Sequence, residues 1–498
     1  MAKYLIVLLM LLATPLLSAK PKAIVVFLAD DLGYGDTSAY GQRAVPTPNL
    51  EQLCREGLRF TDAHSATPVC TPSRYSMLTG RYAFRLPNNN ILDGDAKLII
   101  PCEGGDECDV TLPVLMKRAG YRTAAIGKWH LGMGTGEEPI NWNAEIKPSP
   151  REVGFDKSFV MAATADRVPC VYIEDGKVVG LEADDPIEVS YDRVSRKWED
   201  EITANTNPEL LKAWGRPSDH QHDKTIIDGI SRIGHMRGGK AASWKDQDLA
   251  DRITTEAEKF IHESKGKPIF LYFATNDIHV PRDPNSRFRG KSGLGIRGDA
   301  TVQMDDSLGR IRKALADNGY DDTLFIFTSD NGPYISDGYE DGARECWKGI
   351  NPANPYRGGK YEVYEGGTRV PMVVVWPGHI NAADESSALI SHTDFARSLA
   401  KIAGVEVPSG ACEDSKELSC VILGKTKKGR DSLLEQGAWG PWAYRKGDWK
   451  YVEASKATGG EQLYNLSDDP SERENLATVK LDKFVELRNE LKELRAVE

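Results

Sequence analysis

Short, continuous apolar runs recur along the chain, and they are rich in β-branched and aromatic residues. They cover residues 23–29 (AIVVFLA), 121–126, 268–274 (PIFLYFA), 323–328 (TLFIFT) and 370–376. Runs of this length and composition are typical of strands that are buried on both faces of a sheet. The pattern therefore predicts these runs as strands in the core of a large sheet.

Helix-capping residues separate the predicted strands. Thr47 and Pro48 are typical of a helix start, and Gly57 is typical of a helix end. Leu50 and Leu53 supply the apolar face between them. Further helices are predicted over residues 111–119 and 251–264. Strands that alternate with helices indicate an α/β fold, with a large and mostly parallel central sheet flanked by helices on both faces.

The pattern changes after about residue 425. Residues 443–452 and 462–466 read as an antiparallel hairpin, and residues 476–494 read as an amphipathic closing helix. This part of the chain is predicted to form a smaller C-terminal α+β subdomain with an antiparallel sheet. The expected division is a leader over 1–19, a large domain over 20–425 and a subdomain over 426–498.

The N-terminus has the pattern of a secretory signal peptide. Lys3 is the only charged residue before Lys20, an apolar stretch fills residues 4–17, and small residues follow at Ser18 and Ala19. The alternative is an N-terminal membrane anchor, although the apolar run is short for a span. We therefore expect an exported protein, periplasmic or secreted, with no membrane span after the signal is removed.

Composition narrows the classes of partner. The chain has 498 residues, with 63 Lys and Arg against 74 Asp and Glu, so its formal net charge is −11. The apolar share of 40% excludes a multi-span membrane protein, and the acidic balance argues against nucleic acid as a partner. An anionic substrate would need local cations to hold it.

Eight cysteines are present, and an exported protein can form disulfides. Cys102 and Cys108 are close in sequence, as are Cys412 and Cys420, so each pair is a candidate disulfide. No CxxC pair or His-Cys cluster suggests a zinc site.

Acidic residues follow two of the predicted strands. Asp30 and Asp31 come after the first, and Asp330 and Asn331 come after the strand at 323–328. Ligand sites in open α/β sheets lie beyond the carboxyl ends of the strands. Three carboxylates and an amide that meet there would need a cation, and hard oxygen donors favour Ca²⁺ over Zn²⁺. The alternative is that they are ordinary turn residues.

The segment Cys70–Arg74 (CTPSR) carries a second chemical signal. Thr71 and Pro72 predict a helix start, which places Cys70 at the positive end of that helix, where anions bind. Arg74 follows one turn later and points back toward the same place. The alternative is a buried structural cysteine.

These motifs together resemble a known enzyme family. Cys70–Arg74 with Leu78–Gly80, followed by Gly120–Thr123 and Gly127–His130, is similar to the two signatures of the type I formylglycine-dependent sulfatases. That family belongs to the alkaline phosphatase superfamily, and the resemblance extends from Ala23 to the C-terminal hairpin. It implies an alkaline-phosphatase-like fold and a sulfuric ester hydrolase.

The resemblance also implies a modified nucleophile and a metal. It implies that a formylglycine-generating maturation enzyme oxidises Cys70 to formylglycine (3-oxoalanine), whose hydrated aldehyde attacks sulfur. It implies one Ca²⁺ ion, bound by Asp30, Asp31, Asp330, Asn331 and the modified Cys70.

Further roles follow from matching positions. The resemblance implies that Arg74, Lys128 and His130 hold the nucleophile and tune its ionisation. It implies that Asp330 accepts a proton from the attacking hydroxyl, that His279 contacts the sulfate and protonates the leaving oxygen, and that Lys360 binds the sulfate. Taken singly, such a lysine is more often a solvated surface charge and such a histidine more often structural.

Longer segments resemble one branch of the family. Residues 166–172, 234–245 and 276–282 are similar to carbohydrate sulfatases related to N-acetylgalactosamine-6-sulfatases and galactose-6-sulfatases. This resemblance implies exo-removal of a 6-O-sulfate from a galactose-type unit of a sulfated glycan. Candidate sugar contacts are Asp166, Arg167, His220 and His222, with structural loop bonds as the alternative. Trp129 is either a sugar platform or a packed core aromatic.

Other functions stay open at this point. The enzyme alternatives are an arylsulfatase, a sulfatase of another sugar position, and a formylglycine-dependent phosphodiesterase or phosphonate hydrolase. The non-enzyme alternative is a pseudo-sulfatase that binds sulfated glycan without turnover. The intact residue set from Asp30 to Lys360 argues against the last, because a binding protein has no need of a nucleophile.

Overall fold

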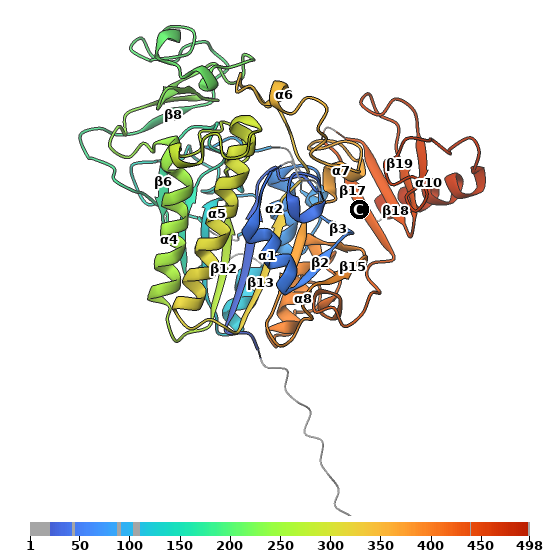
Figure 1. The fold of residues 1–498 in the computed structure, drawn as a ribbon. Helices are drawn as coiled ribbons and strands as arrows, with labels where there is room; N and C mark the ends of the chain where they lie inside the picture. Colours follow the sequence, from blue (N-terminus) through green and yellow to red (C-terminus); the bar gives the residue numbers. More distant parts are fainter. Residues whose placement is uncertain (1–19, 42–44, 87–90, 103–109, 439, 497–498) are drawn as a thin grey trace, which may run out of the picture.

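The described residues are arranged around one twisted sheet of ten strands, which stand upright at the centre of Figure 1. This computed structural model describes residues 20–41, 45–86, 91–102, 110–438 and 440–496. The order across the sheet is β15 (Asp384–Ser386), β2 (Leu58–Phe60), β14 (Met372–Val375), β13 (Thr323–Ser329), β1 (Ala23–Ala29), β12 (Ile269–Ala274), β4 (Arg122–Lys128), β5 (Lys157–Met161), β6 (Tyr172–Glu174) and β7 (Lys177–Val178).

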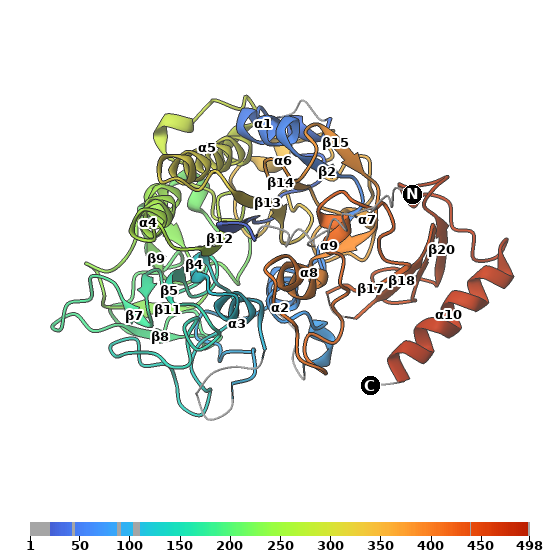
Figure 2. The ribbon, with the colours of Figure 1, turned by 90° about the horizontal axis from the view of Figure 1, so that it is seen from below.

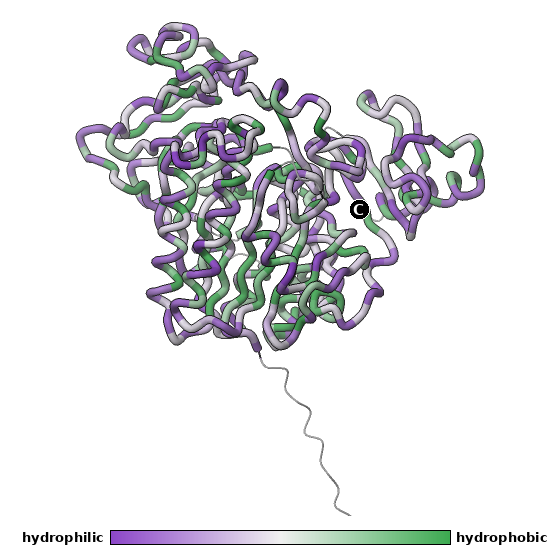
Figure 3. Tube along the Cα trace, in the orientation of Figure 1, coloured by the Kyte–Doolittle hydropathy of each residue, from purple (hydrophilic) through white to green (hydrophobic). Residues whose placement is uncertain are grey.

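The centre of the sheet is parallel, as predicted. β13, β1, β12, β4 and β5 pair in parallel with their neighbours. The predicted strand at 370–376 exists as β14, but it runs antiparallel to β13. Every residue of β1 is buried, and Figure 3 shows the hydrophobic residues concentrated along these central strands. Both faces of the sheet must therefore be covered.

Helices cover the two faces (Figure 2). One face carries α1 (Pro48–Glu56), α4 (Leu249–Glu263) and α5 (Gly295–Asp317). The other carries α2 (Cys70–Thr79), α3 (Leu112–Arg118) and α8 (Phe395–Ile402). The predictions of α1, α3 and α4 are confirmed, whereas α5 has no counterpart among them. Its buried side includes Arg297, Asp299 and Asp305, so it lacks an uninterrupted apolar stripe.

The C-terminal part forms its own antiparallel sheet beside the main one. Its strands are β17 (Ser432–Gln436), β18 (Trp442–Lys446), β19 (Trp449–Val452) and β20 (Gln462–Asn465), paired in that order. The helix α10 (Leu481–Ala496) packs on it through an aromatic and aliphatic cluster that includes Trp442, Tyr451 and Leu487. The predicted hairpin and closing helix are confirmed, and β17 adds a strand.

An irregular lobe stands over the carboxyl edge of the main sheet, at the upper left of Figure 1. It contains two small antiparallel ribbons, β8 (Glu188–Ser190) with β11 (His235–Arg237), and β9 (Ile226–Ile227) with β10 (Ile230–Ser231). This lobe therefore lies on the side of the sheet where the predicted site residues end their strands.

One predicted disulfide is wrong. Cys412 and Cys420 are both free thiols. Cys412 is buried, whereas Cys420 is exposed in the short helix α9 (Ser419–Ile422). Cys412 instead packs against Gly80: a Cβ added to that glycine would lie 2.7 Å from Cys412 Cβ. Cys102 is disulfide-bonded, and Cys108 lies outside the described residues, so that pairing stays a prediction.

The predicted signal peptide over residues 1–19 lies outside the described residues. Within the described part of the chain, none of the helices combines the length and the apolar character that a membrane crossing requires.

Candidate active site

The acidic residues that follow β1 and β13 lie side by side. The two strands are parallel neighbours whose register pairs Ala29 with Ser329, so the residues that come next meet at the same edge. The backbone N–H of Asp31 donates to Asp330 Oδ1 at 3.3 Å, and Asn331 Nδ2 donates to Asp31 Oδ1 at 2.8 Å. The side chains of Asp30, Asp31, Asp330 and Asn331 are all buried.

Three buried cations compensate the three carboxylates. Lys128 Nζ lies 2.7 Å from an oxygen of Asp30, and Arg74 Nε donates to Asp330 Oδ2 at 2.9 Å. Lys360 Nζ donates to Asp31 Oδ2 at 2.9 Å. Arg74 comes from α2, Lys128 ends β4 and Lys360 lies in a loop, so three distant segments supply the positive charge. Burying charged side chains is energetically unfavourable, so such charges are retained where they serve a function or a specific structure.

The acidic cluster suits a hard cation. Burial, together with the neighbouring carboxylates of Asp330 and Asp31, raises the pKa of Asp30 to about 7 despite the opposing charge of Lys128. Asn331 Oδ1 is buried without a hydrogen-bond donor among the described residues. Closely spaced carboxylate and amide oxygens are the ligands that Ca²⁺ takes in proteins, and the unsatisfied Asn331 oxygen is one of them here. The residues that are present therefore fit the predicted ion.

Cys70 lies at the N-terminal end of α2, as predicted, although the helix begins one residue earlier than Thr71, at Cys70 itself, with Val69 in the N-cap position. Its Sγ lies 3.3 Å from Nδ1 of His130. Burial raises the pKa of the Cys70 thiol, although Lys128 and Lys360 oppose this. An unmodified side chain at this position is therefore a protonated thiol, which is a weak nucleophile.

Hydrogen bonds indicate the tautomers of the two buried site histidines. In His130, Nε2 donates to the carbonyl oxygen of Leu92 at 2.9 Å, so Nδ1 presents a lone pair toward Cys70. In His279, Nδ1 donates to the carbonyl oxygen of Val280 at 2.7 Å, which leaves Nε2 to face Asp31 at 4.0 Å. Burial lowers the pKa of both histidines, so both are neutral before substrate binds.

Backbone strain accompanies these side chains. Asp31 and His130 have φ values of 54° and 55°, in the left-handed region that residues with a Cβ rarely adopt. Such conformations persist where the surrounding fold holds them, and they concentrate at functional sites.

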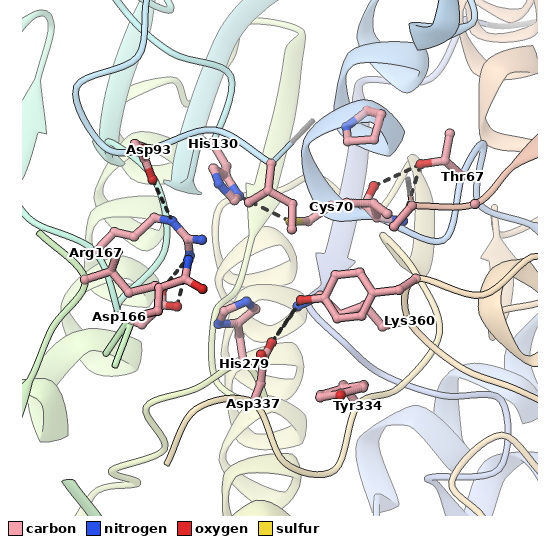
Figure 4. Close-up of a pocket in the computed structure, with 18 of the residues that line it drawn as sticks. Thr67, Cys70, Asp93, His130, Asp166, Arg167, His279, Tyr334, Asp337 and Lys360 are labelled. Atoms are coloured by element: carbon pink, nitrogen blue, oxygen red, sulfur yellow. Dashed lines mark hydrogen bonds and ion pairs between the residues drawn. The ribbon is translucent and has the colours of Figure 1, made fainter. Parts of the chain in front are cut away.

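A pocket of about 820 Å³ opens beside the cluster. Figure 4 shows Cys70, His130, His279 and Lys360 facing it from four different segments. The other polar or charged residues that line it are Thr67, Asp93, Asp166, Arg167, Arg193, Gln221, His222, Tyr334, Asp337, Tyr361 and Gln436. A volume of this size accommodates a small molecule or the terminal unit of a polymeric ligand.

The predicted sugar contacts divide into two groups. Arg167 Nη1 lies 2.9 Å from Asp166 Oδ2, and His222 Nε2 lies 3.5 Å from the same oxygen. All three are buried and line the pocket. His220 is not brought to the pocket: its side chain is fully exposed, and it contacts Asp223 at 3.2 Å. Trp129 is buried, and its Nε1 donates to the carbonyl of Gly132, so it is a core residue rather than a platform.

Among the residues that line the pocket and were not predicted from the sequence are Asp337, Tyr361 and Tyr334. Asp337 accepts a hydrogen bond from the Tyr361 hydroxyl at 3.1 Å and lies 3.5 Å from Lys360 Nζ. The ring of Tyr334 meets that of Tyr361 edge-on, with centroids 5.4 Å apart. No motif marks these residues, and only their nearness in sequence to Asn331 and Lys360 offered a signal.

Family profiles match nearly the whole described chain. Residues 22–405 match a profile described as Sulfatase. Residues 359–497 match a profile described as N-sulphoglucosamine sulphohydrolase, C-terminal. The first match alone covers well over half of the chain.

Individual relatives agree with these profiles. N-acetylgalactosamine-6-O-sulfatase of Bacteroides thetaiotaomicron is 45% identical over 474 residues, covering 92% of this chain and 90% of that protein. Human N-acetylgalactosamine-6-sulfatase is 30% identical over 409 residues, covering 81% of this chain and 66% of that protein. Human arylsulfatase A is 30% identical over 508 residues, covering 94% of this chain and 86% of that protein.

A solved structure shares the complete architecture. It comes from work on the metabolism of multiple glycosaminoglycans by Bacteroides thetaiotaomicron, and its TM-score to this chain is 0.91 at 43% identity. The match covers 96% of this chain and 100% of that chain. On the evidence of the two profiles, these relatives and the shared fold, the chain belongs to the sulfatase family and is a hydrolase of sulfate esters.

Proposed function

We propose that the chain removes a 6-O-sulfate from a galactose or N-acetylgalactosamine unit at the end of a sulfated glycan. The pocket carries this proposal, because it joins position 70 at a helix N-terminus to Lys360 and to two neutral histidines. Two relatives named as N-acetylgalactosamine-6-sulfatases, at 45% and 30% identity, support the sugar class.

The groups that the pocket would hold are a calcium ion and a modified Cys70. Asp30, Asp31, Asp330 and Asn331 would bind the ion together with position 70. The ion supplies neutralisation of the sulfate oxygens, and formylglycine supplies, as its hydrate, the hydroxyl that attacks sulfur. The raised pKa of the Cys70 thiol supports the need for that conversion, which a formylglycine-generating maturation enzyme would perform.

His130 would control the protons at position 70. Its Nδ1 lone pair lies 3.3 Å from the Cys70 sulfur, which stands where a hydroxyl of the modified side chain would be. A neutral imidazole in this tautomer would be able to accept a proton from the hydroxyl that does not attack sulfur. Arg74 and Lys128 hold the surrounding carboxylates in place, and Arg74 also donates to the Lys128 carbonyl at 3.0 Å.

Asp330 and His279 would divide the remaining proton transfers. Burial acts to raise the pKa of Asp330, but the charges of Arg74 and Lys128 bring it below its ordinary value. This carboxylate is therefore ionised and would accept the proton of the attacking hydroxyl. His279 Nε2 and Lys360 Nζ lie 4.0 Å and 2.9 Å from the same oxygen of Asp31. Both would therefore reach one bound sulfate, with Lys360 binding it. His279 would take up a proton from solvent once the anionic substrate is bound and would donate that proton to the leaving oxygen.

Asp166, Arg167 and His222 are the proposed sugar contacts. They form one buried, hydrogen-bonded group on the wall of the pocket opposite Lys360 (Figure 4 labels Asp166 and Arg167). A carboxylate beside a guanidinium can accept from one sugar hydroxyl and donate to its neighbour. The exposed His220 is not part of this group.

Export and domain division belong to the same proposal. A signal peptide over residues 1–19 would direct the chain to the periplasm or the exterior, where polymeric glycans are met. The catalytic domain would extend over 20–425 and the C-terminal subdomain over 426–498.

The test is a substrate panel with released sulfate as the readout. It contains galactose and N-acetylgalactosamine sulfated at O3, O4 or O6, an aryl sulfate and an aryl phosphodiester. We expect the 6-sulfated sugars to give the highest kcat/KM. A preference for another position would overturn the 6-O assignment, and a preference for the phosphodiester would favour the alternative chemistry. No turnover of any member by protein carrying formylglycine would favour a binding-only function.

A further inference from the structure

One carboxylate that lines the catalytic pocket has no role in the proposed reaction. Asp337 lies in the loop after β13, and its Oδ2 lies 3.5 Å from Lys360 Nζ. The same oxygen accepts a hydrogen bond from the Tyr361 hydroxyl at 3.1 Å. The Asp337 side chain is 23% exposed, and Figure 4 shows it facing the pocket near Lys360. The lysine that would bind the sulfate therefore has a solvent-accessible carboxylate beside it.

The charges at this end of the pocket are not matched one to one. The three carboxylates of the acidic cluster have three cations, and the cation of Asp31 is Lys360, at 2.9 Å. Within the described chain, Lys360 is also the only cation that pairs with Asp337. One ammonium thus serves two carboxylates. Before an ion or a substrate binds, this end of the pocket carries one negative charge more than it has cations.

The acidic residues of the opposite wall have further cations of their own. Asp166 lies 2.9 Å from Arg167 and 3.5 Å from His222. Asp93 lies 3.8 Å from Arg167, and the charge of Arg193 also acts on it. Among the described acidic residues that line the pocket, the remaining one is therefore the carboxylate whose single cation is already paired with another acid.

The chain holds Asp337 from both sides. Two residues before it, the carbonyl of Ile335 accepts a hydrogen bond from the buried Arg282 side chain at 2.9 Å. Directly after it, Gly338 has a φ of 82°, and a Cβ there would lie 2.1 Å from the His222 ring, so only glycine fits. The position of the Asp337 charge is therefore set by packing on both sides.

The substrate and the product of a sulfatase differ in charge. A sulfate ester carries one negative charge, whereas inorganic sulfate carries two, as does a phosphate ester at about pH 8. All three present a similar tetrahedral group, so shape separates them poorly. Every cation at the site attracts a dianion more strongly than a monoanion. Discrimination against the second charge therefore requires a negative group that faces the bound anion.

We propose that Asp337 is a specificity-determining residue that disfavours a second negative charge on the group bound at Lys360. It favours sulfate esters over phosphate esters, and it eases the release of inorganic sulfate after hydrolysis. The inference rests on the proposed function in taking Lys360 as the sulfate-binding residue, and it is independent of the sugar. Repulsion by a charge without its own partner is a common way to reject a close analogue.

Two anions of similar shape and different charge test this by calorimetry on the metal-loaded protein that carries formylglycine. Methanesulfonate is a tetrahedral monoanion, and inorganic sulfate is a dianion. Asp337→Asn removes the charge and keeps an oxygen that can accept from Tyr361, whereas Asp337→Glu keeps the charge. Glu340→Gln is the control of equal charge change, since Glu340 is exposed, lies three positions away and does not line the pocket.

We expect Asp337→Asn to bind methanesulfonate about fivefold and sulfate about twenty-five-fold more tightly, because the electrostatic free energy is proportional to the charge of the ligand. The gain for the dianion is thus the square of the gain for the monoanion. Asp337→Glu and Glu340→Gln should keep the natural ratio of the two affinities. An equal change for both anions, no change, or weaker binding of both in Asp337→Asn would each overturn the proposal, since a merely structural role moves both anions alike.

Turnover of two aryl esters with the same leaving group provides a second readout. In Asp337→Asn, kcat/KM for the aryl phosphate relative to the aryl sulfate should rise by about fivefold at about pH 8, and inorganic sulfate should become a stronger inhibitor. Neither the anions nor these esters contain a sugar, so a failed 6-O preference would leave a positive result standing. An unchanged ratio would overturn the role of Asp337 even if 6-sulfated sugars prove to be the preferred substrates.

Discussion

Lys450 of the C-terminal sheet reaches Glu365 of the main body, with Nζ 2.9 Å from Oε1 and both side chains fully buried. The same ammonium lies 3.1 Å from Glu435 and 3.4 Å from Glu472. One cation therefore meets three buried carboxylates at the junction of the two sheets. Glu435 directly precedes Gln436, which lines the catalytic pocket, so this junction is continuous with the site.

Replacing Lys450 should destabilise the whole molecule. Lys450→Met leaves three buried carboxylates without their shared cation, and an uncompensated buried charge costs about 3–5 kcal/mol. We expect a loss of that size in the free energy of unfolding, measured by denaturant titration. Lys446→Met, in the neighbouring strand, removes an exposed lysine that contacts Glu490 and should leave stability close to that of the natural chain. Equal losses in the free energy of unfolding for the two substitutions would show that the buried network contributes no more to stability than the exposed contact does.

His222 should make stability depend on pH. Burial disfavours its charged form, but the carboxylates of Asp166 and Asp219 outweigh burial and raise the pKa of His222 to about 9. Because the folded value lies above the unfolded one, the stabilisation is fully present below about pH 6.5 and is lost as pH rises through about 9. A shift of this size corresponds to about 3 kcal/mol.

We therefore expect His222→Asn to flatten the fall in unfolding free energy between pH 6.5 and pH 9, measured at several pH values in that window. His220→Asn is the matched control, since that side chain is fully exposed two positions away. A profile that His222→Asn leaves unchanged would mean that the imidazole is neutral in the folded state.

Local patterns predicted the elements that carry the site. β1 and β13 are continuous apolar runs that end in Asp or Asn, and parallel neighbours bring such ends together whatever surrounds them. The start of α2 could be predicted because Thr and Pro are favoured at helix starts, and Thr71 and Pro72 lie in the first turn of α2. These features depend on a few adjacent residues.

The features that were missed depend on contacts between distant segments. Arg282 donates to the backbone carbonyl of Tyr334, whose side chain lines the pocket, and nothing in either segment alone indicates that bond. α5 buries charged residues that pair with partners far away in sequence, as Arg297 does with Asp36, so its hydrophobic pattern is interrupted. Cys412 and Cys420 are close in sequence but differ in burial, which spacing cannot show.

Cys70→Ala should abolish turnover and leave the fold intact. The change removes the precursor of the nucleophile, whereas the loss of one buried sulfur costs only about 1 kcal/mol. We expect sulfate release from the preferred substrate to fall by at least about a thousandfold, with an unchanged circular dichroism spectrum. Mass spectrometry of the peptide around position 70 should show the aldehyde in the active natural chain.

Cys420→Ala provides the control, because that thiol is free and exposed. It should retain full activity. Full activity in Cys70→Ala, or a persistent thiol at position 70 in active protein, would refute the proposed nucleophile.

His279→Ala should separate substrates by the quality of their leaving group. A sugar alkoxide needs a proton as it leaves, whereas an activated aryl oxide leaves without one, so the loss should be large for the sugar sulfate and small for the aryl sulfate. General acid catalysis contributes about a hundredfold to ten-thousandfold, which sets the expected loss in kcat for the sugar. The aryl sulfate should lose less than about tenfold, since only contacts to the sulfate are removed. His279 Nε2 lies 4.0 Å from Asp31 Oδ2, the oxygen that Lys360 also contacts. Equal losses on both substrates would therefore assign His279 to sulfate binding and would contradict its role as the acid that protonates the leaving oxygen.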